Sequence, residues 1–578
     1  SEVAISIDSV VVNSGANLVL KDNGILNISK SLVNRLGGTV SATGNGRINM
    51  LDGSIITDSA TFSMNGFGTV NFLGSGTISA YQPTNSPQRI TFHNLWINSG
   101  ILTLPNTTNT AIKTSLVPWV MGEFRINGGG ITTPNTNQTY GPRFGPSANL
   151  VYASGTTQRR GREWFAPPFD GNAGYPRNII VENGTTLILD GGPTVSSTSL
   201  VCGGNFTIRS GTVRVDINKP FEVMGNLQIG ENAGSNATMN IGRLASEVDA
   251  VTTTIMDNSP NNFLIVQGSF TVYPNSTYNT RLNKRGVFHF KGTGTSIFEI
   301  PGSDPMNSNP AMTLNSVHVE KNGILILKSS LAITDSINFS NGAIIQTEPN
   351  IFLRIEAAAT ITGCGPTRFV AGKLEKVTNS TPGNPSNDFT FHIGKIIGGN
   401  PVYKPVKIAN LKHSGTTIYS AEYKDSSTTA SPRSNSFFDA YLQGIWSTEF
   451  WEVNKVSGSG KARVGIPYVK DKSWTTSPQG SSNIGVVRWT GSSWEFTKDE
   501  GNFNDTTNTY PEFLPVAYND TVFTDTLATF SPFTIGWGDY TVLSIKLLYF
   551  TGTLSGNDAL LKWKIAQTED LKHFIVEH

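Results

Sequence analysis

A short unit that recurs about every twenty residues constrains the fold of this 578-residue chain more than any other feature. Asn-Gly pairs begin at Asn23, Asn45 and Asn65, which are 45−23 = 22 and 65−45 = 20 residues apart, and short alternating runs of apolar and polar residues follow such turns. Periods of this length are typical of solenoids, in which each repeat forms one coil. We therefore predict an all-β fold in which residues 1–375 form an elongated, right-handed parallel β-solenoid.

Alternation within the runs predicts which side chains form the core. Successive side chains of a strand point to opposite faces, so we expect Leu18, Leu20, Ile25 and Ile28 to point inward and to stack on their equivalents in the next coil. The glycine after each asparagine is expected to supply the positive φ of a corner. Because one coil cannot bury its own apolar face, stability is expected to come from neighbouring coils.

The composition favours an exported β-protein and excludes some partners. Lys plus Arg (43) nearly cancel Asp plus Glu (42), so no basic surface for nucleic acid is indicated. No apolar run reaches the roughly 18 residues of a membrane span. Ser1 is not followed by a signal-peptide pattern, so we expect the numbering to begin on a processed product. The only cysteines, Cys202 and Cys364, are expected to be unpaired thiols.

An insertion rich in proline, glycine and aromatic residues interrupts the repeat at about 134–176. Its proline content argues against central strands and favours a loop or lateral flap. One interpretation is a structural flap that packs its aromatic residues onto the solenoid. The other is a patch for a ligand or partner, formed by Arg160, Arg162, Trp164, Phe165 and Phe169.

The texture of the sequence changes after residue 375. Short alternating strands at the spacing of a sandwich run through residues 376–540, which we predict to form an antiparallel β-sandwich. One expected hairpin joins Ile484–Trp489 to Ser493–Phe496 across a Thr-Gly-Ser turn. Residues 541–578 contain only two or three strands, too few to close a core, so they are possible donor strands.

Several of these motifs resemble the β-strand-repeat surface proteins that Bacteroidota export by type IX secretion. In the first part, the resemblance rests on Asn149–Tyr152, Gln158, Gly161, Glu163, Trp164, Pro176, Asn178, Ile179, Asn183 and Gly184. In the second part, it rests on Phe389–Lys395, Tyr403, Pro405, Val406, Phe450–Asn454 and Ser531–Gly536. Leu547–Gly552, Leu560–Lys564 and His573–Glu577 resemble the start of a fibronectin-like unit. The resemblance implies an extracellular or cell-surface location and carries no catalytic activity.

The residues give no sign of catalysis, although some β-helices are carbohydrate-active enzymes. Such sites need neighbouring carboxylates, and the predicted solenoid has no Asp-Asp pair and no recurring acidic position. Nucleophile and metalloprotease motifs are also missing from the sequence. We expect no catalytic residue, no cofactor and no metal, and interpret the acidic residues Asp499, Glu500, Asp505, Asp520 and Asp525 as a solvated loop face.

One modification motif occurs more often than composition predicts. Asp, then Ser or Thr, then a small aliphatic residue or Thr resembles the O-glycosylation sequon of exported Bacteroidota proteins. The matching hydroxyl residues are Ser9, Ser59, Ser336, Thr506, Thr521 and Thr526. We predict sugars at these positions.

The first strand is not preceded by a polar cap, and the last strands lack partners, so both ends invite pairing with other chains. A head-to-tail contact of this kind repeats without closing and makes a filament. We therefore predict an extracellular structural subunit that assembles with itself into a cell-surface filament or sheath. The alternatives are a monomeric adhesin that binds surface glycans and a β-helix carbohydrate-active enzyme.

Overall fold

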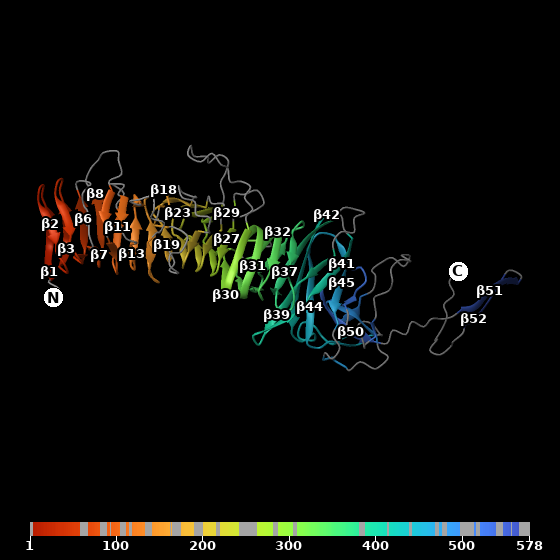
Figure 1. The fold of residues 1–578 in the computed structure, drawn as a ribbon. Helices are drawn as coiled ribbons and strands as arrows, with labels where there is room; N and C mark the ends of the chain where they lie inside the picture. Colours follow the sequence, from red (N-terminus) through yellow and green to blue (C-terminus); the bar gives the residue numbers. More distant parts are fainter. Residues whose placement is uncertain are drawn as a thin grey trace. The chain divides into compact units, whose positions relative to one another are not determined.

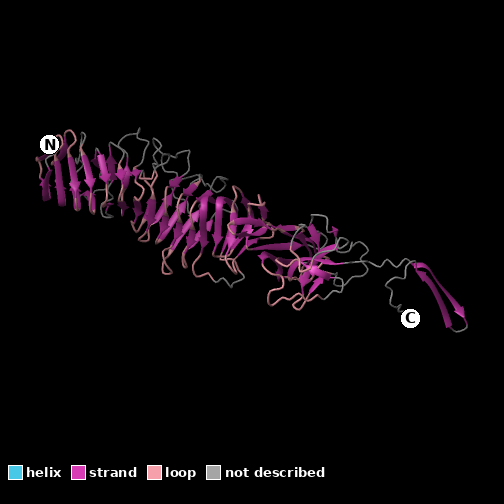
Figure 2. Cartoon of the chain, turned by 90° about the horizontal axis from the view of Figure 1, so that it is seen from below, coloured by secondary structure: helices cyan, strands magenta, loops and turns pink. Residues whose placement is uncertain are grey.

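The computed structural model describes residues 4–57, 68–80, 89–92, 94–104, 111–114, 118–132, 142–161, 163–164, 175–189, 200–215, 220–241, 263–280, 287–303, 309–380, 388–412, 415–437, 442–468, 473–476, 483–497, 514–515, 521–538, 547–555 and 558–565. These residues form strands and turns and contain no helix (Figure 2). Among them there is consequently no helix that could cross a membrane. The chain is a parallel β-solenoid followed by an antiparallel β-sandwich, as the sequence predicts.

A continuous series of parallel pairings runs through the solenoid, whose strands stack side by side in Figure 1. In order of pairing, its members are β1 (Ala4–Val12), β3 (Ile25–Asn34), β6 (Gly53–Thr57), β8 (Gly76–Ala80), β11 (Ile101–Leu104), β14 (Glu123–Ile126), β17 (Asn149–Tyr152), β19 (Asn178–Val181), β22 (Phe206–Ile208), β25 (Leu227–Ile229), β28 (Phe270–Val272), β30 (Val287–Glu299), β31 (Met312–Leu327), β33 (Ile344–Thr347), β36 (Phe369–Ala371) and β39 (Ile393–Ile397).

Shorter parallel series complete the coils. Five strands follow β3: β5 (Arg47–Met50), β7 (Thr69–Phe72), β10 (Asn94–Ile97), β13 (Trp119–Val120) and β16 (Arg143–Phe144). Three lead into β30: β21 (Leu200–Cys202), β24 (Phe221–Val223) and β27 (Phe263–Val266). Others are β32 (Leu331–Phe339), β34 (Phe352–Ile355) and β35 (Thr360–Thr362).

Three separate parallel sheets form the remaining walls. The first is β2 (Asn17–Leu20) with β4 (Thr39–Ala42), and the second is β9 (Arg89–Phe92), β12 (Ala111–Thr114) and β15 (Gly130–Thr132). The third is β18 (Thr157–Arg159), β20 (Thr186–Leu189), β23 (Gly211–Val215), β26 (Ala237–Ile241) and β29 (Thr277–Thr280).

Apolar residues in register fill the interior of the coils. One inward column consists of Ile28, Met50, Phe72, Ile97, Val120 and Phe144, all buried. Each such residue contributes about 1.5–3 kcal/mol on burial, which only the adjacent coils make possible. Leu20 and Ile28 are buried as predicted. The expectation for Ile25 is wrong, because Leu26 and Ile28 set the inward phase of β3 and leave Ile25 half-exposed between them.

Glycine serves the corners in two ways. At the Asn-Gly pair of Asn183 and Gly184, both residues have positive φ, 57° and 67°, as predicted. Gly46 has no positive φ, and the left-handed residue is Gly44 instead. A Cβ at Gly46 would lie 2.9 Å from the Cβ of Leu20 in the preceding coil, so glycine is needed there for space. The rule that every such glycine supplies the φ of a corner is therefore wrong.

Pairing changes from parallel to antiparallel in β37 (Lys373–Ser380). Its first half pairs in parallel with β34, and the strand also pairs antiparallel with β42 (Gly415–Asp425), which pairs with β44 (Glu449–Ser457). The predicted boundary at residues 375 and 376 falls within this strand. A separate sheet contains β38 (Phe389–Phe391), β41 (Val406–Lys412) and β45 (Lys461–Pro467), whereas β40 (Asn400–Tyr403) pairs antiparallel with β39.

The described chain divides into two compact units. The first comprises Ser1–Asp425, Trp451–Val464 and Ala528–Pro532, and the second comprises Ser426–Phe450, Gly465–Leu527 and Phe533–His578. The strands of the second unit are β43 (Leu442–Ile445), β46 (Asn483–Trp489), β47 (Trp494–Phe496), β48 (Leu514–Pro515), β49 (Thr521–Phe523), β50 (Pro532–Gly538), β51 (Leu547–Ser555) and β52 (Asp558–Ile565). The expected hairpin is present as β46 and β47, whose Trp489 and Trp494 are paired and buried.

Candidate functional site

The predicted ligand patch contains a tryptophan that is part of the core. The ring of Trp164 is fully buried, with its centroid 6.1 Å from that of Phe206 and 5.9 Å from that of Phe221. Its indole N–H donates a 2.9 Å hydrogen bond to the carbonyl oxygen of Val201. Of the two interpretations of the insertion, the ligand patch is therefore wrong for Trp164, and the packing of an aromatic residue onto the solenoid holds for it.

Glu163 beside it is buried as well and anchors the same segment. Its carboxylate accepts hydrogen bonds from the Tyr152 hydroxyl at 3.0 Å and from the backbone N–H of Gly161 at 2.6 Å. Burial, and then the Glu163 charge, raise the pKa of Tyr152 well above its usual value. Burial lowers the pKa of the Arg160 guanidinium, which donates to the carbonyl oxygen of Trp164 at 2.8 Å. These contacts make the motif a structural anchor of the insertion.

The other members of the patch, Arg162, Phe165 and Phe169, lie outside the described residues.

The hydroxyl residues predicted to carry sugars differ in exposure. Ser9 is exposed, Ser336 and Thr521 are half-buried, and Thr526 is buried, which leaves little room for a sugar on its hydroxyl. The prediction for Thr526 therefore conflicts with the fold. Ser59 and Thr506 lie outside the described residues.

An exposed tryptophan pair lies on the outer face of the solenoid, at a place that the sequence analysis did not single out. Trp96 of β10 and Trp119 of β13 are in register on adjacent coils. Both face outward, because their neighbours Ile97 and Val120 point inward. Trp96 is 38% exposed and Trp119 is 39% exposed. With the exposed Met121, they form what we call the tryptophan platform (Trp96, Trp119 and Met121).

The platform borders an open groove of about 310 Å³, which Ile97 and Asn98 also line. Neighbouring residues pack against the side chains of the platform. The guanidinium of Arg143 lies over the ring of Trp119, 5.2 Å from the ring centroid. A Cβ at Gly145 would lie 2.5 Å from the sulfur of Met121, so the thioether packs directly over this glycine. An exposed apolar surface bordered by polar groups is typical of a ligand or partner site.

Asparagines occupy the same outward position on the preceding coils. Asn27, Asn49 and Asn71 are in register, and Asn71 is in register with Trp96. Their amides form a ladder, in which Asn71 donates to Asn49 at 3.3 Å and Asn49 donates to Asn27 at 2.9 Å. We call the whole set the outer column. Its members are Asn27, Asn49, Asn71, Trp96, Trp119 and Arg143.

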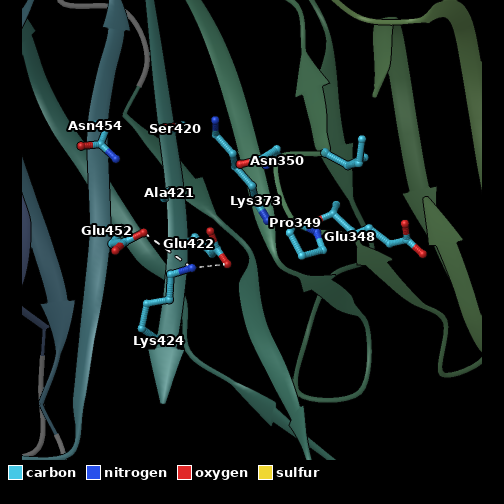
Figure 3. A pocket seen from close by; sticks show the side chains of 12 residues that line it. Glu348, Pro349, Asn350, Lys373, Ser420, Ala421, Glu422, Lys424, Glu452 and Asn454 are labelled. Atoms are coloured by element: carbon cyan, nitrogen blue, oxygen red, sulfur yellow. Dashed lines mark hydrogen bonds and ion pairs between the residues drawn. The ribbon is translucent and has the colours of Figure 1, made fainter. Parts of the chain in front are cut away.

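A second concave surface, the charged groove, lies in the first unit between the turn after β33 and strands β37, β42 and β44 (Figure 3). It encloses about 380 Å³ and carries Lys373, Glu422, Lys424 and Glu452 on its walls. Lys424 pairs with Glu422 at 2.6 Å and with Glu452 at 3.6 Å. Lys424 is thus neutralised by these two carboxylates. Glu348 also lines the groove, so its three carboxylates outnumber its two ammonium groups and no net positive charge favours an anionic ligand there.

The chain's thiols and histidines were the remaining candidates for chemistry. Cys202 and Cys364 are unpaired, which confirms the prediction, and burial raises the pKa of each thiol to about 12. His289 and His318 stack on adjacent coils with centroids 4.5 Å apart. Within the described ranges, no three His, Cys, Asp or Glu side chains are placed to hold a metal ion. Of the five acidic residues predicted to be a loop face, only Asp525 is described.

Trp96 and Trp119 are not among the residues predicted from the sequence, because the predicted aromatic patch lies in the irregular insertion. The signal was present in the strands, since Leu95 and Ile97 flank Trp96 and take the inward positions. A tryptophan at an outward position of such a run departs from the usual polar residue and therefore indicates a surface site. Comparison with protein-family models, curated proteins and solved structures found no match to the chain.

Proposed function

We propose that this protein is a non-enzymatic extracellular scaffold that binds carbohydrate through the tryptophan platform. The observation that carries the proposal is the pair of outward tryptophans, in register on adjacent coils and each more than a third exposed. Single exposed apolar side chains are common on protein surfaces, but two large ones in register form a contiguous apolar surface, which is typical of an interaction site.

Carbohydrate fits this surface better than a purely apolar ligand. The C–H face of a pyranose ring is apolar and packs flat on an indole, while its hydroxyls need hydrogen-bonding groups around the edge. The Asn98 amide lines the groove, the Asn71 amide is in register with Trp96, and the Arg143 guanidinium lies over the ring of Trp119. This combination of a few polar groups around an apolar floor is typical of binding sites for small polar molecules.

Location and the absence of catalysis belong to the same proposal. The low charge content and the resemblance to exported Bacteroidota surface proteins support an extracellular or cell-surface location. The ion pairs of Lys424 with Glu422 and Glu452 and the raised pKa of the Cys202 thiol support a binding role rather than a catalytic one. In this function the solenoid supplies a rigid surface, and the platform supplies the contact.

A glycan array probed with the full chain and with the Trp119→Ala variant tests the proposal. We expect the wild type to bind a set of glycans and the variant to lose at least tenfold in affinity, as for a central aromatic contact. Phe550→Ala is the matched control, because Phe550 is also an exposed aromatic but lies on the β51–β52 hairpin. Equal binding by the wild type and Trp119→Ala would contradict the proposal.

Head-to-tail self-assembly is the second candidate function, and exposed core positions favour it. In β1, Ile5 and Ile7 are in register with the buried Leu26 and Ile28, yet they are 59% and 43% exposed. This exposed face of β1 would accept a strand of another copy. The β51–β52 hairpin, with Leu554 84% exposed, would be a suitable donor.

Size-exclusion chromatography and negative-stain microscopy test the assembly. We expect filaments from the wild type and monomers from the double variant Ile5→Lys, Ile7→Lys, because two charges at the face prevent coil stacking. Leu36→Lys is the control, since Leu36 is exposed at a turn. Monomers alone from the wild type at every salt concentration would remove this candidate.

Glycosylation is proposed at the exposed or half-buried hydroxyls of Ser9, Ser336 and Thr521. The support is the sequon and the room at these three positions. Intact mass of the protein from its native source would exceed the polypeptide mass by whole sugar residues. A mass equal to that of the bare chain would contradict the assignment.

A further inference from the structure

The outer column gives the solenoid one outward side chain per coil along a straight line. Adjacent parallel strands lie about 4.8 Å apart, so the six positions from Asn27 to Arg143 span about 24 Å. This spacing is close to the length of one pyranose residue in an extended polysaccharide chain. A chain lying along the coil axis would therefore meet a new side chain with each sugar, whereas a chain lying across the coils would meet the platform only once.

The amide ladder ends with an unfilled acceptor beside the platform. Each amide donates toward the preceding coil: Asn71 to Asn49, Asn49 to Asn27, and Asn27 to the hydroxyl of Ser6. The side-chain oxygen of Asn71 has no hydrogen-bond partner in the described structure, although the residue is only 6% exposed. A buried carbonyl without a donor costs free energy, which a ligand hydroxyl would recover. The donor would enter next to Trp96, which is in register with Asn71.

The ladder also leaves hydrogen-bonding capacity on its outer side. A primary amide has two N–H donors and two acceptor lone pairs. Asn49 uses one donor toward Asn27 and one lone pair toward Asn71. One N–H and one lone pair of this half-buried side chain are thus left for hydroxyls that lie over the column.

Charge decides between classes of polysaccharide. Five of the six outer-column side chains are neutral, and the only charged one, Arg143, lies at the end of the column over the ring of Trp119. An acidic chain would leave its carboxylates without cations over most of its length. Sugars with equatorial hydroxyls present apolar C–H groups on both faces, so successive rings can each stack on an indole.

We propose that the outer column binds an extended, uncharged, β-linked polysaccharide along the solenoid axis, with sugar rings on Trp96 and Trp119 and hydroxyls on Asn71 and Asn49. This inference rests on the proposed carbohydrate-binding function and adds the ligand class and its direction. The oxygen of Asn71 is covered in the free protein, so binding must move a neighbouring group to reach it.

Calorimetric titration of the full chain with β-1,4-linked glucose, xylose and N-acetylglucosamine oligomers of two to eight residues tests the inference. Affinity for at least one series should rise with length and level off at about six sugars, the number of outer-column positions. Asn71→Ala should lose about tenfold for the hexamer and less than twofold for the dimer. Asn49→Ala should show the same pattern, and it disturbs a less buried residue.

Asn338→Ala is the matched control, because Asn338 also donates to a neighbouring coil, at Thr362, but lies outside the outer column. It should bind like the wild type. Trp119-dependent binding that does not increase beyond the dimer, or tighter binding of an acidic oligomer, would overturn the inference and leave the proposed function intact. Binding of any oligomer that Trp119→Ala does not weaken would overturn both.

Discussion

Replacing Trp164 by alanine should destabilise the solenoid around the insertion by several kcal/mol. The side chain is fully buried between Phe206 and Phe221, so its loss leaves a cavity in a core that already pairs those two rings at 5.5 Å. Truncations of this kind cost about 3–5 kcal/mol. The carbonyl oxygen of Val201 also loses its indole donor, which adds about 1 kcal/mol. We expect a total of about 4–6 kcal/mol.

The loss should be local, because each coil of a solenoid contacts only its neighbours and long repeat arrays do not unfold as one unit. Hydrogen exchange measured by mass spectrometry therefore suits the question better than a global melt. Backbone amides of β21, β22 and β24 should exchange faster by a factor that corresponds to the lost free energy. Amides of β31 and β33, several coils away, should keep their protection.

Trp119→Ala is the control, since the same residue type is removed from a position that is 39% exposed. Its effect on stability should stay within about 0.5 kcal/mol, as for most surface substitutions. The reasoning would be refuted if Trp164→Ala cost less than about 1 kcal/mol, or if the two tryptophans proved equally costly. Either result would mean that Trp164 does not pack in the core of the solenoid.

Three further outcomes follow from the buried polar groups. Tyr152→Phe should cost about 1–3 kcal/mol in local exchange, because the buried Glu163 carboxylate loses a donor. Because burial raises the pKa of Cys202 to about 12, a maleimide at pH 8 should leave this thiol unlabelled until denaturant is added, and labelling in the native state would contradict its burial. Burial, and then His318, lower the pKa of His289 from 6.5 to about 4, so the unfolded state binds the extra proton between these pH values. Local stability should therefore fall by at most about 3 kcal/mol as the pH drops from 6.5 to 4, and His289→Asn should remove this dependence.

The sequence predicts the inward columns well and the outward columns poorly. An inward position tolerates only apolar residues. A run such as Ile25–Ile28 in a strand can therefore turn only one of its two faces inward, and the face is selected by the residues that the adjacent coil presents. Ile25 and Ile28 are three residues apart in β3 and therefore point to opposite faces, so only one of them could be inward, and it is Ile28. The sequence also indicates corners such as Asn183-Gly184, whose left-handed geometry few residue pairs adopt.

The site was hard to predict because residue type alone does not distinguish a tryptophan in the core from one on the surface. Trp164 lies in an irregular segment without alternation, so nothing in the sequence showed that it turns inward. Trp96 and Trp119 lie in short strands, where alternation does assign a face once the strand is recognised. The register that places them side by side depends on coil lengths across the intervening segments, and no local pattern fixes those lengths.

This contrast suggests how function is distributed on such a fold. A solenoid must keep its inward columns apolar along the whole chain, because each coil depends on the next for burial. The outward columns carry no such constraint. Ladders of amides or hydroxyls such as Asn27–Asn49–Asn71 satisfy the hydrogen bonds of these positions from coil to coil. Two partly exposed indoles that interrupt the polar ladder do not continue its hydrogen bonds from coil to coil. The proposed carbohydrate binding accounts for such a change, and the unfilled acceptor of Asn71 at the point of interruption is the place where a ligand hydroxyl would continue the ladder.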